Sequence, residues 1–271
     1  MSHAAPHPRC DTPTGMRRLL LVDIDDTVVD WIGPAGEAII AAAATHRALA
    51  GSDPQQLADR FLEIVEETHS LWMAGALKVD QLRSERIRRL MAESAGVDLD
   101  DAEAEALSTA YRTAYLRARR PLTGAPELLA AVRRRGARVV AVTNNLVAEQ
   151  EDKLRATGLR HLFDAVVISE AVGVSKPDPH IFEHALREGH ASAGKSIMLG
   201  DSWANDVLGA VASGIAAAWL DRRGLGVPDP SVPVLRLTSL GPAEEVATRL
   251  LALERPRPSP AGRASRHAGI G

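Results

Sequence analysis

The feature that most constrains the fold is an unbroken apolar run, residues 19–22, that ends in two aspartates one residue apart, Asp23 and Asp25. Such a run predicts a strand buried on both faces, as in a parallel α/β sheet, whose ligands bind at the carboxyl ends of the strands. Because two neighbouring carboxylates repel each other, we expect a cation between them or a retained proton on one of them. The alternative is an acidic turn in which Asp26 or Thr27 caps the next helix.

Two later apolar runs predict further strands of the same sheet, and polar side chains follow both. Residues 138–142 lead into Thr143 and Asn144, a hydroxyl followed by backbone amides at the start of a helix, which is suited to binding an anion. Residues 196–199 lead into Asp201. The predicted strands therefore end in groups of different chemistry: paired carboxylates, a hydroxyl with amides, and a carboxylate suited to a metal ion.

A lysine stands in a stiff turn between these two segments. Lys176 belongs to the sequence Ser-Lys-Pro-Asp-Pro, before a helix predicted at residues 181–187. Taken alone, Lys176 would be a solvated surface lysine, and Thr143 would be an ordinary helix N-cap. Their occurrence together with the strand-end aspartates favours a shared site.

The overall composition excludes several classes of partner. The chain has 271 residues, 45% of them hydrophobic, which is enough for a large core in one or two domains. A net charge of -3 gives no electrostatic basis for binding a nucleic acid polymer or an anionic membrane, so the predicted partner is a small molecule. The single cysteine, Cys10, favours a reducing compartment. The sequence has no recognisable signal peptide or membrane span, so we expect a cytoplasmic protein. The sequence does not determine its oligomeric state.

The spacing of the first two strands predicts an inserted domain. More than a hundred residues separate them, whereas a βαβ crossover needs far fewer. Residues 31–120 have the pattern of successive amphipathic helices and predict an all-helical second domain. Its expected helices cover residues 35–49, 54–73, 79–94 and 101–118. The core is expected to comprise residues 16–30 and 121–254, with a helix at 127–135, and the tails 1–15 and 255–271 are expected to be disordered.

The segments around Asp23, Thr143, Lys176 and Asp201 match, in order and spacing, the four motifs of the haloacid dehalogenase (HAD) superfamily, which the chain resembles over residues 18–30 and 121–220. The resemblance implies a Rossmann-like α/β core with the first motif on the central strand of a parallel sheet, an inserted helical cap over the catalytic face, and aspartyl-phosphate chemistry. One departure concerns Asp26, because many members have glycine there. The nucleotidase-like branch tolerates a polar residue at this position.

The resemblance also implies roles for individual residues in phosphate ester hydrolysis. Asp23 would attack phosphorus to give an aspartyl-phosphate. Asp25 would protonate the leaving alkoxide and then take a proton from the attacking water, a double role that requires a raised pKa. Lys176 would pair with the phosphoryl charge, while the Thr143 hydroxyl and the Asn144 amide would bind its oxygens.

Magnesium is the cofactor that the resemblance implies. Asp23, Asp201 and the backbone carbonyl of Asp25 would provide its oxygen ligands. Asp206 would orient Lys176 or a metal-bound water. An equally simple interpretation of Asp206 is a favourable interaction with the dipole of the following helix. Trp203 is interpreted as packing.

The second aspartate separates two reactions of this superfamily. Dehalogenases release halide, need neither proton nor metal, and lack this residue, so Asp25 favours phosphoryl transfer. A 2-haloacid dehalogenase, a phosphomutase and a HAD-fold binding protein without turnover stay open as alternatives. Residues 157–164 and 167–177 further resemble bacterial pyrimidine 5′-nucleotidases, which predicts nucleoside 5′-monophosphates as substrates. Other phosphate monoesters, namely a sugar phosphate, phosphoglycolate or N-acylneuraminate 9-phosphate, are the alternatives.

Within the expected cap, Leu71, Trp72, Gly75 and residues 81–83 carry the nucleotidase resemblance. Trp72 could stack on a base, although a tryptophan at helical spacing is more often part of a core. Arg83 and Arg86 are equally well interpreted as surface charges.

Overall fold

The computed structural model describes residues 18–49, 51–73 and 79–254, with the side chains of residues 69–80 also outside the description. The predicted tails, Cys10, Leu71, Trp72 and Gly75 therefore lie outside the described residues or side chains. Within the described part, no helix is both long enough and apolar enough to cross a membrane.

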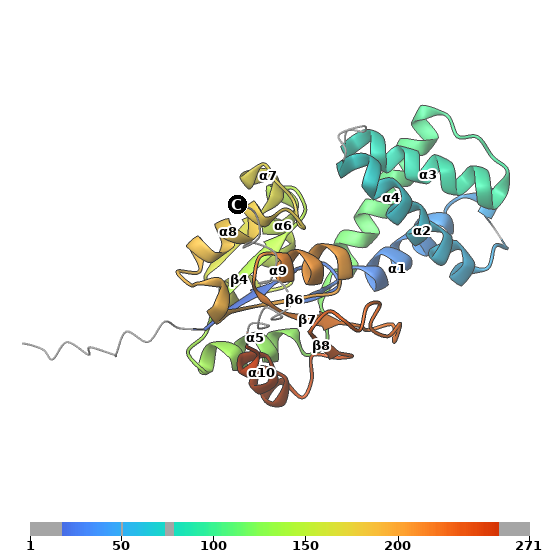
Figure 1. Cartoon of the computed structure of the whole chain (residues 1–271). Helices are drawn as coiled ribbons and strands as arrows, with labels where there is room; N and C mark the ends of the chain where they lie inside the picture. The colour runs from blue at the N-terminus through green and yellow to red at the C-terminus, as the bar shows by residue number, and fades with distance from the viewer. Residues whose placement is uncertain (1–17, 50, 74–78, 255–271) are drawn as a thin grey trace, which may run out of the picture.

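A six-stranded parallel sheet forms the centre of the larger domain, in the order β5-β4-β1-β6-β7-β8 (Figure 1). The apolar run predicted as a strand is β1, which is fully buried and lies between β4 and β6. Residue Val22, at the end of β1, is level with Ala141 and Leu199 on these neighbours. The prediction of an α/β fold with the first motif on a central strand is confirmed. The strands are β1 Leu19–Val22, β4 Arg138–Thr143, β5 Ala165–Ile168, β6 Ser196–Gly200, β7 Ala216–Leu220 and β8 Val234–Leu237.

Alternate residues of β1 bury opposite faces of the sheet, as the period of a strand requires. Leu20 and Val22 pack in the cluster that includes α5 (Ala125–Arg134) and α10 (Ala243–Ala252). Leu19 and Leu21 pack with α8 (Pro179–Glu188) and α9 (Gly209–Ala212) on the other face. Both faces are therefore covered, which explains why the run has no polar residue. The remaining elements of this domain are α6 Val147–Ala156, α7 Ser169–Val172, the π-helix Trp203–Leu208 and the 3-10 turns Arg160–Leu162 and Ala193–Lys195.

The chain leaves and re-enters this domain through a short antiparallel pair, β2 (Val29–Asp30) with β3 (Arg120–Pro121). Four helices lie between them and stand to one side of the sheet (Figure 1). They share a hydrophobic cluster of their own, which contains Ile39, Phe61 and Leu90. The helices are α1 Ile32–Ala43, α2 Pro54–Met73, α3 Val79–Ala95 and α4 Asp101–Ala118, with a 3-10 turn at Arg47–Leu49.

The first inserted helix differs from the prediction of residues 35–49. It begins earlier because the Asp26 carboxylate accepts hydrogen bonds from the backbone N–H groups of Trp31 and Ile32, each at 3.1 Å. It ends at Ala43, where the Thr45 hydroxyl donates to the carbonyl of Ala42 at 2.7 Å. Side-chain hydrogen bonds at both ends, rather than periodicity, therefore set its limits.

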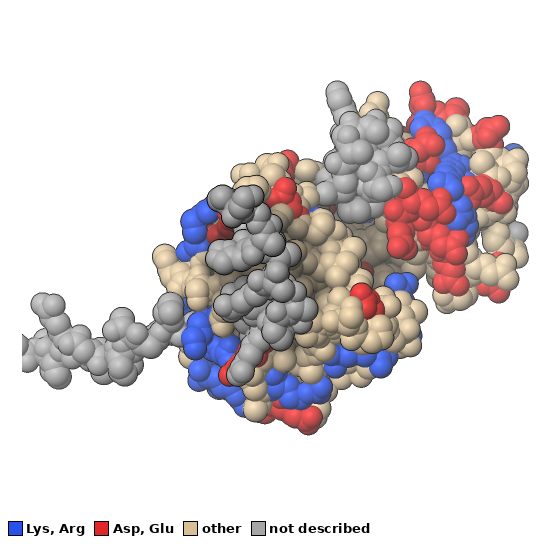
Figure 2. Space-filling view, in the orientation of Figure 1, with Lys and Arg blue, Asp and Glu red and all other residues tan. Residues whose placement is uncertain are grey.

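The outer surface of the insertion carries charges of both signs in close alternation (Figure 2). Arg60 on α2 contacts Glu63, Glu67 and Glu93, and Arg89 on α3 contacts the last two as well. These charges neutralise one another across the two helices. This part of the surface offers no basic stripe of the kind that a nucleic acid polymer requires.

Candidate active site

The carboxyl end of β1 places Asp23 inside the protein. Its backbone N–H donates to the Leu199 carbonyl at 2.9 Å, so the pairing with β6 continues one residue past the strand. The residue is only 8% exposed. Its neighbours at this edge are the ends of β4 and β6, as expected for groups that follow adjacent parallel strands.

Lys176 is buried against two aspartates, so the surface interpretation of this residue is wrong. Its Nζ donates to Asp23 Oδ1 at 2.6 Å and to Asp206 Oδ1 at 2.7 Å. Asn144 fixes the lysine backbone, because its side chain donates to the Lys176 carbonyl at 2.8 Å and accepts from the Lys176 N–H at 2.7 Å. Burial lowers the pKa of the Lys176 ammonium, but the charges of Asp206 and Asp23 outweigh this effect and raise it above its usual range. The lysine is therefore held as a cation.

Each oxygen of the Asp206 carboxylate accepts a different hydrogen bond. Oδ1 accepts from Lys176, and Oδ2 accepts from a backbone N–H group. Asp206 is fully buried, and the N–H group that donates to Oδ2 is that of Ser202, at 3.0 Å. A Cβ at Gly200 would overlap this carboxylate, so the end of β6 must be glycine there. Asp206 is thus a buried partner of Lys176, and the interpretation as a simple helix-dipole residue does not account for these contacts.

Asp23, Asp201 and Asp206 bring one carboxylate oxygen each within 4.8 Å of one another. Burial raises the pKa of Asp23 to about 7, with Lys176 opposing the shift and Asp206 adding to it. Burial and the charges of Asp23 and Asp206 raise the pKa of Asp201 well above its usual range. One ammonium does not balance this set of carboxylates. Clustered oxygens with excess negative charge are the donors that Mg²⁺ prefers, so these residues fit a bound magnesium ion.

Asp25 lies beside Asp23 but has different partners, all from the segment after β4. Its Oδ1 accepts from Lys153 Nζ, and its Oδ2 accepts from Gln150 Nε2 at 2.7 Å and from Asn145 Nδ2 at 3.5 Å. Burial raises the pKa of Asp25, but the charge of Lys153 and these hydrogen bonds outweigh it and lower the pKa below its usual range. The expectation of a raised pKa is therefore wrong for this state of the protein.

The lysines add contacts that the prediction for the aspartate pair did not include. We expected a cation between the two carboxylates or a retained proton on one of them, and the raised pKa of Asp23 agrees with a retained proton. In addition, Asp23 contacts Lys176, which it shares with Asp206, and Asp25 contacts Lys153. The sequence prediction missed Lys153 and Gln150, although their spacing of three residues on the helix after Thr143 places them on one face, near the strand end.

Asp26 and Thr27, the residues of the helix-capping alternative, have different roles in the structure. Asp26 has a backbone φ of 55° and caps the start of α1 through its carboxylate, as described above. This left-handed conformation explains why glycine suits the position and why aspartate is tolerated. Thr27 instead donates to Asp201 Oδ1 at 3.2 Å. The turn therefore both starts a helix and supports the acidic site.

Thr143 is buried at the last position of β4, where its hydroxyl accepts from Gln150 Nε2 at 3.1 Å. The N-cap of α6 is Leu146, so the interpretation of Thr143 as an ordinary N-cap is wrong. Trp203 packs edge-on against Trp219, with ring centroids 5.3 Å apart, in agreement with its predicted role. The Trp219 indole in turn donates to the Asp201 carbonyl at 2.8 Å.

Arg83 and Arg86 of the insertion are not simple surface charges. Arg86 donates to the Thr68 hydroxyl at 2.8 Å, and burial lowers its pKa to about 10. Arg83 contacts Glu149 on α6 at 2.5 Å, and Arg112 reaches the same carboxylate at 3.1 Å. The insertion is therefore tied to the sheet domain through α6.

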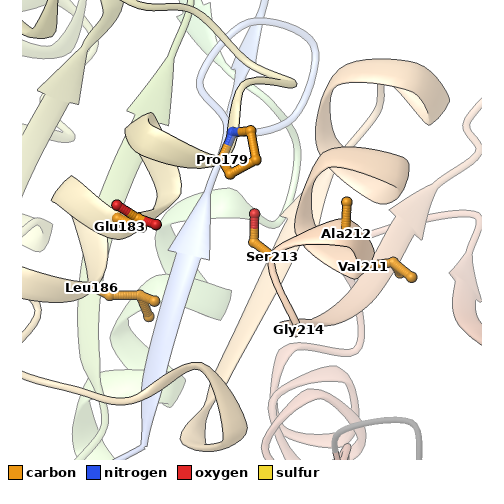
Figure 3. Close-up of a pocket in the computed structure, with 7 residues that line it drawn as sticks. All are labelled: Pro179, Glu183, Leu186, Val211, Ala212, Ser213 and Gly214. Atoms are coloured by element: carbon orange, nitrogen blue, oxygen red, sulfur yellow. The ribbon is translucent and has the colours of Figure 1, made fainter. Parts of the chain in front are cut away.

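A separate hollow of about 340 Å³ lies between α8 and α9, lined by Pro179, Glu183, Leu186, Val211, Ala212, Ser213 and Gly214 (Figure 3). None of the acidic or basic residues described above lines it. The hollow therefore does not belong to the candidate active site.

Residues 18–214 match the family model of haloacid dehalogenase-like hydrolases, and the chain belongs to this family. It is 37% identical over 141 residues to pyrimidine 5′-nucleotidase YjjG of Escherichia coli, covering 52% of this chain and 62% of that protein. It is 40% identical over 131 residues to a phosphoserine phosphatase of Thermus thermophilus, covering 47% of this chain and 52% of that protein. The chain thus spans between half and two thirds of these relatives.

A solved structure shows the same fold at lower identity. The HAD hydrolase YfnB of Bacillus subtilis, bound to magnesium, superposes with a TM-score of 0.70 at 22% identity, over 87% of this chain and 99% of that chain.

Proposed function

We propose that this protein is a magnesium-dependent phosphomonoester hydrolase that works through an aspartyl-phosphate. The observation that carries the proposal is the set of buried Asp23, Lys176 and Asp206 with the half-buried Asp201, and with Asp25 two residues beyond Asp23. A cation held against the nucleophile and a second acidic group nearby are the parts that phosphoryl transfer to a carboxylate requires.

In this proposal Asp23 Oδ attacks phosphorus while Lys176 and the Thr143 hydroxyl bind phosphoryl oxygens together with the Asn144 backbone amide. Asp206 and the side chain of Asn144 hold Lys176 in place. Asp23, Asp201 and the backbone carbonyl of Asp25 would hold magnesium, which would supply positive charge that reduces the repulsion between the nucleophile and the phosphate.

Asp25 transfers protons in both halves of the reaction. The low pKa set by Lys153 keeps Asp25 ionised, and only an ionised carboxylate can accept a proton from the water that hydrolyses the aspartyl-phosphate. For the first half it must carry a proton to the leaving alkoxide. The negative charge of a bound phosphate ester raises the pKa of a nearby carboxyl, which favours that proton only when substrate is present.

We propose nucleoside 5′-monophosphates as the substrates, supported by the identity with YjjG. The identity with a phosphoserine phosphatase supports the broader class of small phosphate monoesters as the second candidate. The two relatives, a nucleotidase and a phosphatase, have in common the removal of phosphate, and the site proposed in this protein contacts the phosphate rather than the leaving group.

Release of inorganic phosphate from p-nitrophenyl phosphate, with Mg²⁺ and with EDTA, tests the reaction class. A panel of uridine 5′-monophosphate, phosphoserine, sugar phosphates and phosphoglycolate then tests the substrate. We expect Mg²⁺-dependent turnover with the highest kcat/KM on the nucleotide. Halide release from a 2-haloacid in EDTA would contradict the proposal, and absence of any turnover would favour a binding protein.

A further inference from the structure

Asp25 is held from one side by a single helix. Lys153 and Gln150 lie three residues apart on α6 and bind different oxygens of the Asp25 carboxylate. Both helix residues are buried: Gln150 has no exposed surface, and Lys153 is 4% exposed. The Asp25 side chain keeps 28% of its surface exposed, so these contacts do not close it off completely. Donors on both oxygens fix the plane of a carboxylate, which a single hydrogen bond would leave free to rotate.

Gln150 has the orientation that this arrangement needs. Its Nε2 donates to Asp25 Oδ2 and to the Thr143 hydroxyl, at 2.7 and 3.1 Å. Its Oε1 is buried without a hydrogen-bond partner among the described residues. Rotating the amide would place that oxygen against the carboxylate, so the orphaned acceptor costs less than the alternative. A glutamine that served only to pack would not be expected to leave an acceptor unsatisfied.

An adjoining face of α6 is anchored to the insertion. Glu149 accepts from Arg83 and Arg112, and Asp152 accepts from Arg119 at 2.7 Å. The helix that binds Asp25 is therefore also held by the insertion. A fixed helix can position the residue that it binds to within the small tolerance that proton transfer requires.

We propose that Lys153 and Gln150 are positioning residues, which hold the Asp25 carboxylate so that its exposed part faces the oxygen of the leaving group. This inference rests on the proposed phosphatase function and assigns to α6 a part in it. Asp25 Oδ1 uses one lone pair for Lys153 and keeps another for the substrate or the attacking water, whereas Oδ2 accepts from both Gln150 and Asn145. Without the two donors the carboxylate stays in the site but no longer in one orientation.

Leaving-group dependence distinguishes this role from a structural one. An alkyl phosphate such as uridine 5′-monophosphate or glycerol phosphate needs a proton on its leaving oxygen. The p-nitrophenolate ion leaves without one. The kcat/KM of both substrates reports the first half of the reaction, so a misplaced Asp25 lowers it for the alkyl esters and spares it for p-nitrophenyl phosphate.

The test compares Lys153→Met with wild type, in the presence of Mg²⁺. We expect kcat/KM on the alkyl ester to fall by about 100-fold, mostly through kcat, and to fall by less than about fivefold on p-nitrophenyl phosphate. Lys153→Arg keeps the cation and should recover at least part of the loss. Arg155→Met removes a cation from the exposed side of the same helix, where its side chain is 64% exposed, and should behave as wild type.

Gln150→Met provides a second variant if Lys153→Met fails to fold, as judged by its thermal melting and circular dichroism. Its kcat/KM should fall by about tenfold on the alkyl ester, with a smaller loss on p-nitrophenyl phosphate. Equal losses on both substrates, or no loss on either, would overturn the inference. If wild type hydrolyses neither ester, the proposed function itself has failed, and this result is distinct from an equal loss in the variants.

Discussion

Asp23 and Asp25 are two residues apart, yet their surroundings give them opposite character. Asp23 shares Lys176 with Asp206 inside an acidic cluster, and burial raises its pKa to about 7. Asp25 has Lys153 to itself, together with two side-chain amides, and its pKa is lowered. Burial raises the pKa of both carboxyl groups, so the different neighbours of Asp23 and Asp25 decide that one pKa ends above its usual value and the other below it.

The largest expected effect comes from removing the carboxylate in the acidic cluster that would attack phosphorus. Asp23→Asn keeps the shape of the side chain but loses the nucleophile, so kcat should fall by more than about 100-fold. Steady-state phosphate release measures this, with circular dichroism to confirm the fold. Retention of more than about a hundredth of wild-type kcat would exclude attack through Asp23.

Removal of the metal tests the acidic cluster as a whole. Because Asp201 lacks a lysine of its own, its excess charge should make turnover depend on Mg²⁺, and Asp201→Ala should abolish activity or raise the Mg²⁺ concentration needed by at least about tenfold. Titration of activity with Mg²⁺ after EDTA treatment measures both. Full activity in excess EDTA would refute the metal assignment and the phosphatase proposal, and would favour a dehalogenase.

A smaller effect is expected from the residue that shares Lys176 with Asp23. Asp206→Asn weakens the hold on the lysine without removing any group that touches the phosphate, so kcat should fall by about tenfold. Asp229→Asn, an exposed aspartate in a surface turn, is the matched control. If Asp206→Asn lost as much activity as Asp23→Asn, Asp206 would act on the reacting groups directly.

The smallest expected effect concerns stability on the Asp25 side. A carboxylate with a lowered pKa stabilises the fold above its ordinary pKa of 3.8, and this contribution is lost as the pH falls through the value in the folded protein. Asp25→Asn in EDTA should therefore lower the free energy of unfolding at pH 7 by about 1–3 kcal/mol. The difference from wild type should shrink on acidification. Urea unfolding at several pH values measures it, and a constant difference would show that the Lys153 pair contributes no ionic stabilisation.

The sequence determined the sheet and the chemistry at its edge. A short apolar run that forms a strand must be covered on both faces of its sheet. The strands β1, β4 and β6 form where the sequence has such runs. Asp23 follows β1 directly and Asp201 follows β6 directly, so the two must meet at one edge. Lys176 and Asp206 lie farther along the chain, beyond β5 and β6, and Lys176 contacts both Asp206 and Asp23 at the same edge. The local pattern was sufficient to predict this edge because adjacent parallel strands end at the same edge of a sheet.

Only the tertiary structure decided how the charges are paired. Lys153 and Gln150 are ordinary polar residues in the sequence of a helix, and nothing local shows that they are buried against Asp25. The pKa of Asp25 therefore had the wrong predicted sign. A pKa depends on distances of a few ångströms between groups far apart in the chain, here residues 25 and 153, and those distances are set by helix packing rather than by pattern.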